Sequence, residues 1–217
     1  MNSHPFLETS DLPHWSSLKP KSIVDDITIA LEKAEQNLQN IRDINNEQVT
    51  FANSIKALEQ STQILDKAWG LVCHVESVCN SEELREAHNK ILPAVSEFGA
   101  KIPLDPELWF TIKAFAESKE SKNLSPIDQR LFEETMKDFE EAGANLPQEK
   151  KKRLEEISSE LAKVTQKFSE NVLDATNAWQ MIVKEEEKLK GLPPSAKASA
   201  KQAAIEKRGE EEGPDSW

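Results

Sequence analysis

The 217-residue sequence contains no tyrosine, only 6 glycines and only 6% aromatic residues. Strands and their tight turns draw on aromatic residues and glycine, so this composition disfavours an all-β fold and favours helices. There are only two cysteines, Cys73 and Cys79, which excludes a disulfide framework. We therefore expect a reducing, cytoplasmic setting.

Long hydrophobic runs are also missing. No apolar run approaches the ~20 residues that span a bilayer. The segment Met1–Ser10 has neither the basic start nor the apolar core of a secretory signal. The formal net charge of −12 opposes a broad attraction to nucleic acid or to an anionic membrane surface. We therefore expect neither nucleic acid nor membrane as a partner.

Apolar residues recur at steps of three and four, the spacing that places side chains on one face of a helix. The first stripe follows Lys21 and consists of Ile27, Leu31, Ala34, Leu38 and Ile41. The second predicts a single long helix, with Thr62 at its one polar step, and consists of Phe51, Ile55, Leu58, Leu65, Trp69 and Val72.

The third stripe is the longest and begins after Pro147. It consists of Leu154, Ile157, Leu161, Val164 and Phe168, and then reaches Val172 and Ala175. Its period resembles the seam of a coiled coil, but it lasts too few heptads to predict one.

Capping residues predict where several helices begin and end. Asn80 followed by Glu83 predicts a helix from Ser81 to about Gly99, with a kink or a break near Asn89 because Pro93 removes a backbone donor. Asp105–Pro106 and Ser125–Pro126 each combine an N-cap with a proline at the first helical position. The first pair is followed by an apolar face made of Leu108, Trp109, Ile112 and Phe115. The second is followed by Leu131, Phe132, Met136 and Phe139, and Gly143 then ends the second helix.

These patterns predict an all-α fold, an irregular bundle of about seven helices. Residues 1–20 carry three prolines and are expected to form an extended arm, with Phe6, Leu12, Trp15 and Leu18 as possible anchors. Residues 21–178 form the predicted helical domain. Residues 179–208 are expected to form a short extended stretch and a terminal helix from Ser195, and residues 209–217 a loose acidic tail.

Histidine and cysteine are the first candidates for metal or acid–base chemistry, and the four histidines are His4, His14, His74 and His88. None forms a His-Glu-x-x-His pattern. Cys73, His74, Cys79 and His88 invite a zinc interpretation, but a six-residue step on one helix turns Cys73 and Cys79 apart by about 240°. Buried small side chains are the better interpretation of the two cysteines.

Charged runs are better explained as surface than as sites. Lys150–Arg153 opens an amphipathic helix in an acidic protein, which favours a solvated face over a nucleic-acid signal. Glu185–Glu187 and Glu210–Glu212 lack the ligand spacing of a calcium loop. There is no Gly-x-Ser-x-Gly elbow and no glycine-rich phosphate loop. We predict no catalytic, cofactor-binding or metal-ligating residue in this chain.

Four collinear segments resemble the thimet-oligopeptidase (M3) family of zinc metallopeptidases. The first two are Leu18–Pro20 and Asn80–His88, the latter continuing through Leu92–Pro93 to Ser96–Gly99. The others are Asp138–Glu140, which continues through Gly143 to Leu146–Pro147, and Asn171–Thr176 with Trp179. Their order and spacing match the N-terminal helical region of the family over nearly the whole chain.

The resemblance implies a wall of a deep channel that admits short, flexible peptides to a zinc ion held elsewhere. In the family, zinc is bound far downstream by His-Glu-x-x-His and a further glutamate, with late tyrosine and histidine residues assisting. None of these has a counterpart here, so the chain is predicted to be inactive alone and to need the catalytic half as its partner. The alternatives are a free-standing helical protein-interaction module and, less favoured, a small helical enzyme with an unrecognised site.

Overall fold

In the computed structural model, described for residues 4–8 and 12–212, all regular secondary structure is helical, and the all-α prediction is confirmed. The eight α-helices of these residues are α1 (Pro20–Arg42), α2 (Ile55–Ser61), α3 (Gln63–Val78), α4 (Glu82–Lys101), α5 (Pro106–Glu117), α6 (Pro126–Ala142), α7 (Gln148–Ala178) and α8 (Pro194–Glu212). Short 3-10 turns connect several of them, including Ile102–Leu104 between α4 and α5.

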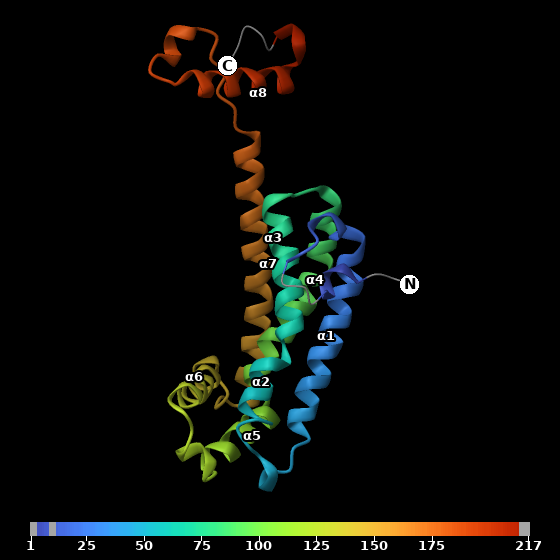
Figure 1. Ribbon diagram of the computed structural model, residues 1–217, viewed down its shortest axis with the longest axis vertical. Helices are drawn as coiled ribbons and strands as arrows, with labels where there is room; N and C mark the ends of the chain where they lie inside the picture. The colour runs from blue at the N-terminus through green and yellow to red at the C-terminus, as the bar shows by residue number, and fades with distance from the viewer. Residues whose placement is uncertain (1–3, 9–11, 213–217) are drawn as a thin grey trace. The chain divides into compact units, whose positions relative to one another are not determined.

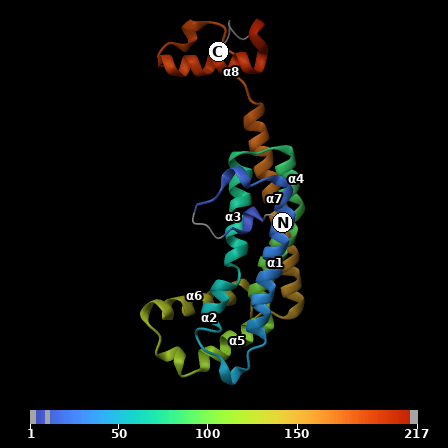
Figure 2. The ribbon, with the colours of Figure 1, turned by 45° about the vertical axis from the view of Figure 1, so that its right-hand side comes forward.

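The chain forms two compact units, residues 1–165 and 166–217. In the first, α1 packs along α3 and α4, and the three helices run side by side in both ribbon views (Figures 1 and 2). Ile23, Ile27, Ala30 and Ala34 of α1 are at most 1% exposed and form one apolar cluster with residues of α3 and α4. This burial makes α1 the central helix of the first unit.

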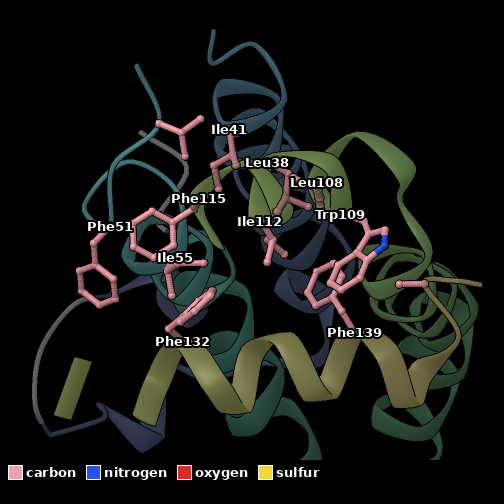
Figure 3. Packing of buried hydrophobic residues seen from close by; sticks show 12 residues of the cluster. Leu38, Ile41, Phe51, Ile55, Leu108, Trp109, Ile112, Phe115, Phe132 and Phe139 are labelled. Carbon is pink, nitrogen blue, oxygen red and sulfur yellow. The ribbon is translucent and has the colours of Figure 1, made fainter. Parts of the chain in front are cut away.

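A second apolar cluster lies where the far end of α1 meets α2, α5 and α6 (Figure 3). Phe115 of α5 meets the edge of Phe132 of α6, with ring centroids 5.2 Å apart. Trp109 stacks on Phe139 at 6.0 Å and donates its indole N–H to Asn145. The predicted apolar residues of α5 are therefore buried. The two caps are also as predicted, because Asp105 accepts from the backbone N–H of Leu108 and Ser125 from that of Asp128.

Two of the predicted helix boundaries are wrong. The second stripe forms two helices, α2 and α3, which are interrupted at Thr62. Asn37 of α1 donates to the carbonyl of Ser61 (3.0 Å) at this point, and the Thr62 hydroxyl donates to the carboxylate of Asp66. These bonds account for the break in the helix. The cap of α4 is Ser81, whose Oγ accepts from the N–H of Leu84. Asn80 instead binds Glu76 and Arg85.

Pro93 does not break α4, which continues from Glu82 to Lys101. Leu84 and Ile91 are buried before the proline, and Val95 and Phe98 pack against the same cluster after it. Packing on both sides of Pro93 therefore holds the helix together despite the missing backbone donor.

The predicted arm contains two 3-10 turns, Pro5–Leu7 and Trp15–Ser17, and α1 begins at Pro20. Phe6 and Leu18 are buried, as expected of anchors, whereas Leu12 and Trp15 are exposed. The N–H of Phe6 donates to the buried carboxylate of Asp26 (2.9 Å), which ties the arm to α1. Residues 1–3 and 9–11 lie outside the described residues.

In the second unit, residues 179–185 have no regular structure. Lys197 of α8 binds Glu186, and Lys207 donates to the carbonyl of Asn177. α8 begins at Pro194 and runs to Glu212. The predicted loose tail is therefore wrong for residues 209–212, and its remaining residues, 213–217, lie outside the described residues.

Candidate functional site

His88 and Cys73 are the only two of the sequence candidates for metal chemistry that the described structure brings into contact. His88 of α4 is 3% exposed, and its ring stacks on Trp69 of α3 with centroids 4.8 Å apart. Its Nε2 lies 4.0 Å from the Cys73 sulfur. Burial, followed by the nearby charge of Glu76, raises the pKa of the Cys73 thiol, so the thiol stays neutral at ordinary pH.

The other candidates lie apart. His4 binds Asp26 and His14 binds Glu8, each at 2.8 Å, while Cys79 is exposed at the end of α3. Among the side chains that the structure describes, no three His, Cys, Asp or Glu residues are close enough together to hold a metal ion. Zinc in proteins takes three or four protein ligands, so the pair of Cys73 and His88 does not fit it.

The sequence predicts a solvated face for the basic run Lys150–Arg153 at the start of α7. This prediction is wrong for one of its residues, Lys151. Lys151 is 5% exposed, and its Nζ donates to the carbonyl of Leu104 (3.0 Å). Lys150, Lys152 and Arg153 are exposed. The ammonium of Lys151 therefore fastens the first turns of α7 to the turn between α4 and α5. The sequence pattern alone does not distinguish Lys151 from the neighbouring basic residues.

A groove of about 1090 Å³ lies between α1 and α4. Its apolar lining includes Leu31, Leu38 and Phe98, and Arg42 lies at one end. Arg42 binds Asp105 (2.9 Å) and Glu35 (2.7 Å). Burial lowers the pKa of Arg42, but the bond to Glu35 and the charge of Asp105 outweigh it and raise the pKa. Because its charge is paired, Arg42 serves to join the end of α1 to the start of α5.

α7 carries the most extended set of exposed apolar side chains. We define the α7 apolar face by its six residues, Leu154, Ile157, Leu161, Val164, Phe168 and Val172. All but the half-buried Leu154 are 44–67% exposed. Apart from Leu154, the residues of α7 that are at least half-buried before Thr165 are polar or small, namely Lys151, Glu155, Ser158, Ser159 and Ala162. Before Thr165, α7 thus turns polar or small side chains inward and most of its apolar side chains to solvent.

Comparison with known proteins identifies the chain. Residues 21–151 match the family model described as the N-terminal domain of neurolysin/thimet oligopeptidase. The chain belongs to this family. It is 35% identical over 205 residues to oligopeptidase A of Haemophilus influenzae, covering 94% of this chain and 30% of that protein. The family resemblance of the quoted segments is thereby confirmed.

Two relatives from Arabidopsis thaliana share this pattern. An organellar oligopeptidase A, chloroplastic/mitochondrial, is 31% identical over 95% of this chain and 26% of its own length. A probable cytosolic oligopeptidase A is 30% identical over 95% of this chain and 29% of its own length. The chain thus spans less than a third of the length of these curated oligopeptidase relatives, and its match lies in their N-terminal domain.

Proposed function

We propose that this chain is the N-terminal, substrate-access domain of a zinc metallo-oligopeptidase that degrades short peptides. Its helices would form one wall of the channel through which peptides reach a catalytic part that the chain does not contain. The N-terminal-domain match at residues 21–151 carries this proposal, because the chain aligns along nearly its whole length with less than a third of each oligopeptidase.

The packing of the first unit supports a mechanical role. A wall that excludes folded proteins must resist deformation, and this requires buried contacts more than reactive groups. α1 is buried against α3 and α4 along one half and against α5 along the other. The bond between Arg42 and Asp105 and that between Lys151 and Leu104 add polar ties between helices.

The location and partners are part of the same proposal. We propose a cytoplasmic location because the chain has only two cysteines, Cys73 and Cys79, and both are free thiols. The names of the two Arabidopsis relatives point to different compartments. None of the described helices combines the length and apolarity required to cross a membrane. The partners proposed are the catalytic half and short peptides, with zinc bound by that half.

Two assays test this function. The purified chain should not hydrolyse a fluorogenic oligopeptide with or without added zinc, and metal-dependent turnover would contradict the proposal. In the second assay, this chain replaces the matched 30% of Haemophilus oligopeptidase A. The chimera should hydrolyse the same peptide with zinc and leave a folded protein intact, and a folded, zinc-loaded but inactive chimera would count against it.

The alternative is a free-standing helical interaction module, for which a uniformly charged surface would be expected. The exposed α7 apolar face favours the access domain over this alternative, because a domain that docks on a catalytic half exposes an apolar surface when that half is absent. If the chain were an independent module, the chimera would be inactive.

A further inference from the structure

Five apolar side chains around the start of α7 form a partly exposed surface within the first unit, residues 1–165. We define the docking face by these residues, Leu146, Leu154, Ile157, Leu161 and Val164. The first two are neighbours, because a Cβ atom added to Gly143 would lie within 3.3 Å of a side-chain atom of each. The last three are 44–62% exposed. Neighbouring exposed apolar side chains of this kind mark a contact with another polypeptide.

The docking face is narrow. On α7, its residues follow steps of three, four and three, so they occupy only about 80° of the helix circumference and span about 15 Å along the axis. A helix that packs on a whole core normally has a wider apolar stripe, of about 100° or more. A narrower stripe with this spacing is typical of contact with a single helix. The docking face therefore fits one amphipathic helix of about three turns.

α7 joins the first unit through a different side. Glu155 and Ser159 are half-buried and line a groove with Glu97 of α4. Successive residues turn by about 100° around a helix, so Glu155 and Ser159 point about 120–160° away from Leu161. The docking face is thus not the side by which α7 packs on α4.

The matches to known proteins indicate what lies beside this face. The N-terminal domain model ends at Lys151, three residues before Leu154. The alignment with oligopeptidase A of Haemophilus influenzae covers 94% of the chain, which includes the docking face, but only 30% of that protein. The docking face therefore belongs to an aligned stretch that follows the domain model, and more than two thirds of the oligopeptidase lies outside the alignment.

We propose that one amphipathic helix of the catalytic part of the oligopeptidase covers the docking face. This inference rests on the proposed function, in which the access domain and the catalytic part belong to one polypeptide. A partner on the same polypeptide has an effective concentration of about a millimolar, well above that of a second copy in solution. The tether therefore favours the catalytic part over self-association as the occupant of the docking face.

Alkylation of an introduced thiol tests the docking face in the full chain and in the chimera with Haemophilus oligopeptidase A. Leu161→Cys places the thiol in the face. Ile127→Cys is the matched control, because Ile127 of α6 is 82% exposed and lies outside the face. Mass spectrometry of the separate peptides distinguishes these thiols from Cys73 and Cys79.

In the full chain, both introduced thiols should react rapidly. In the chimera, the rate at position 161 should fall about tenfold or more, because a covered thiol reacts slowly, whereas the rate at position 127 should not change. Val164→Cys, at a second position of the face, should behave like Leu161→Cys. Equal rates at position 161 in the two proteins, or protection of position 127 instead, would overturn the proposal.

Peptide hydrolysis by the chimera separates this inference from the proposed function. If the chimera is active but position 161 remains as reactive as in the full chain, the access function stands and the docking face is wrong. If a zinc-loaded chimera is inactive but protects position 161, the contact stands and the access function is contradicted.

The full chain alone tests the two other occupants, and this test does not require the chimera to fold. Light scattering at ~10 µM, where a micromolar dimer would already form, should give a mass of 24.5 kDa. A doubled mass that Leu161→Asp returns to 24.5 kDa would assign the face to a second copy. Slow alkylation at position 161 in the monomeric chain would assign it to another part of the same chain. Either result overturns the proposal.

Discussion

α1 and α7 have almost the same pattern of apolar residues, but opposite environments. In α1, Ile27, Ala34, Leu38 and Ile41 are at most 3% exposed, whereas in α7 the corresponding stripe is mostly 44–67% exposed. Steps of three and four thus specify which side of a helix is apolar in both cases. They do not specify what covers that side.

The difference arises from what lies next to each helix. α1 has α3, α4 and α5 around it, and each supplies apolar side chains to one of the two clusters. The first half of α7 presents Lys151, Glu155 and Ala162 inward instead. The apolar side of α1 is therefore part of the core of the folded chain, whereas the apolar side of α7 is exposed.

The largest predicted difference is in the stability of matched truncations in the two helices. Ile27→Ala should lower the free energy of unfolding by about 2–4 kcal/mol because it leaves a cavity in the core. Leu161→Ala should change it by less than about 0.5 kcal/mol, because the Leu161 side chain is 62% exposed. Urea unfolding of both variants measures this, and equal losses would remove the distinction between the helices.

The turn that leads into α7 should be more sensitive to substitution than α7 itself. Gly143 has φ +103°, and a Cβ atom there would lie 2.6 Å from Cδ1 of Leu146. Gly143→Ala should therefore cost about 2 kcal/mol of unfolding free energy.

The control for Gly143 is Gly99→Ala. Gly99 lies inside α4, and a Cβ atom there would meet nothing within 4 Å. Alanine should stabilise the helix at this position by up to about 1 kcal/mol. Thermal unfolding of the two variants should shift in opposite directions, and a destabilised Gly99→Ala variant would contradict this prediction.

A smaller effect should separate two neighbouring lysines of α7. Lys151→Met should lower the unfolding free energy by about 1 kcal/mol, since the carbonyl of Leu104 loses its donor. Lys152→Met, at an exposed position, should have no measurable effect. Chemical unfolding of the pair measures both, and identical curves would mean that Lys151 does not fasten α7.

The smallest predicted effect concerns the thiol of Cys73 in α3. Because the pKa of Cys73 is raised by burial and by Glu76, its alkylation should be slower than that of the exposed Cys79 and should accelerate only at higher pH. The raised pKa favours the folded state below the usual thiol pKa, and that contribution is lost as the pH rises through the folded-state value. Mass spectrometry of timed alkylation measures both rates, and equal rates at pH 8 would contradict the assignment.

Local signals predicted the parts of the fold that depend on neighbouring residues. Asp105 and Ser125 cap α5 and α6 as expected, and Gly143 ends α6 in the left-handed conformation. The break at Thr62 was not predictable in this way, since it depends on Asn37, 24 residues before Ser61. Lys151 was missed for the same reason, because its partner Leu104 is 47 residues away.

The functional assignment was predictable from the sequence only through family resemblance. Among the described residues, no group of His, Cys, Asp and Glu side chains could hold a metal ion. Strings such as Asn80–His88 carried the family relationship that the comparisons confirm. The α7 stripe was visible as a pattern, but its exposure was not, because a periodic stripe has the same sequence whether it is buried or not.

The most direct test of the proposed function is peptide hydrolysis by the chimera in which this chain replaces the matched 30% of Haemophilus oligopeptidase A. We predict zinc-dependent hydrolysis of a fluorogenic oligopeptide and no cleavage of a folded protein. A chimera that folds and binds zinc but does not hydrolyse the oligopeptide would contradict the claim that this chain is the access domain.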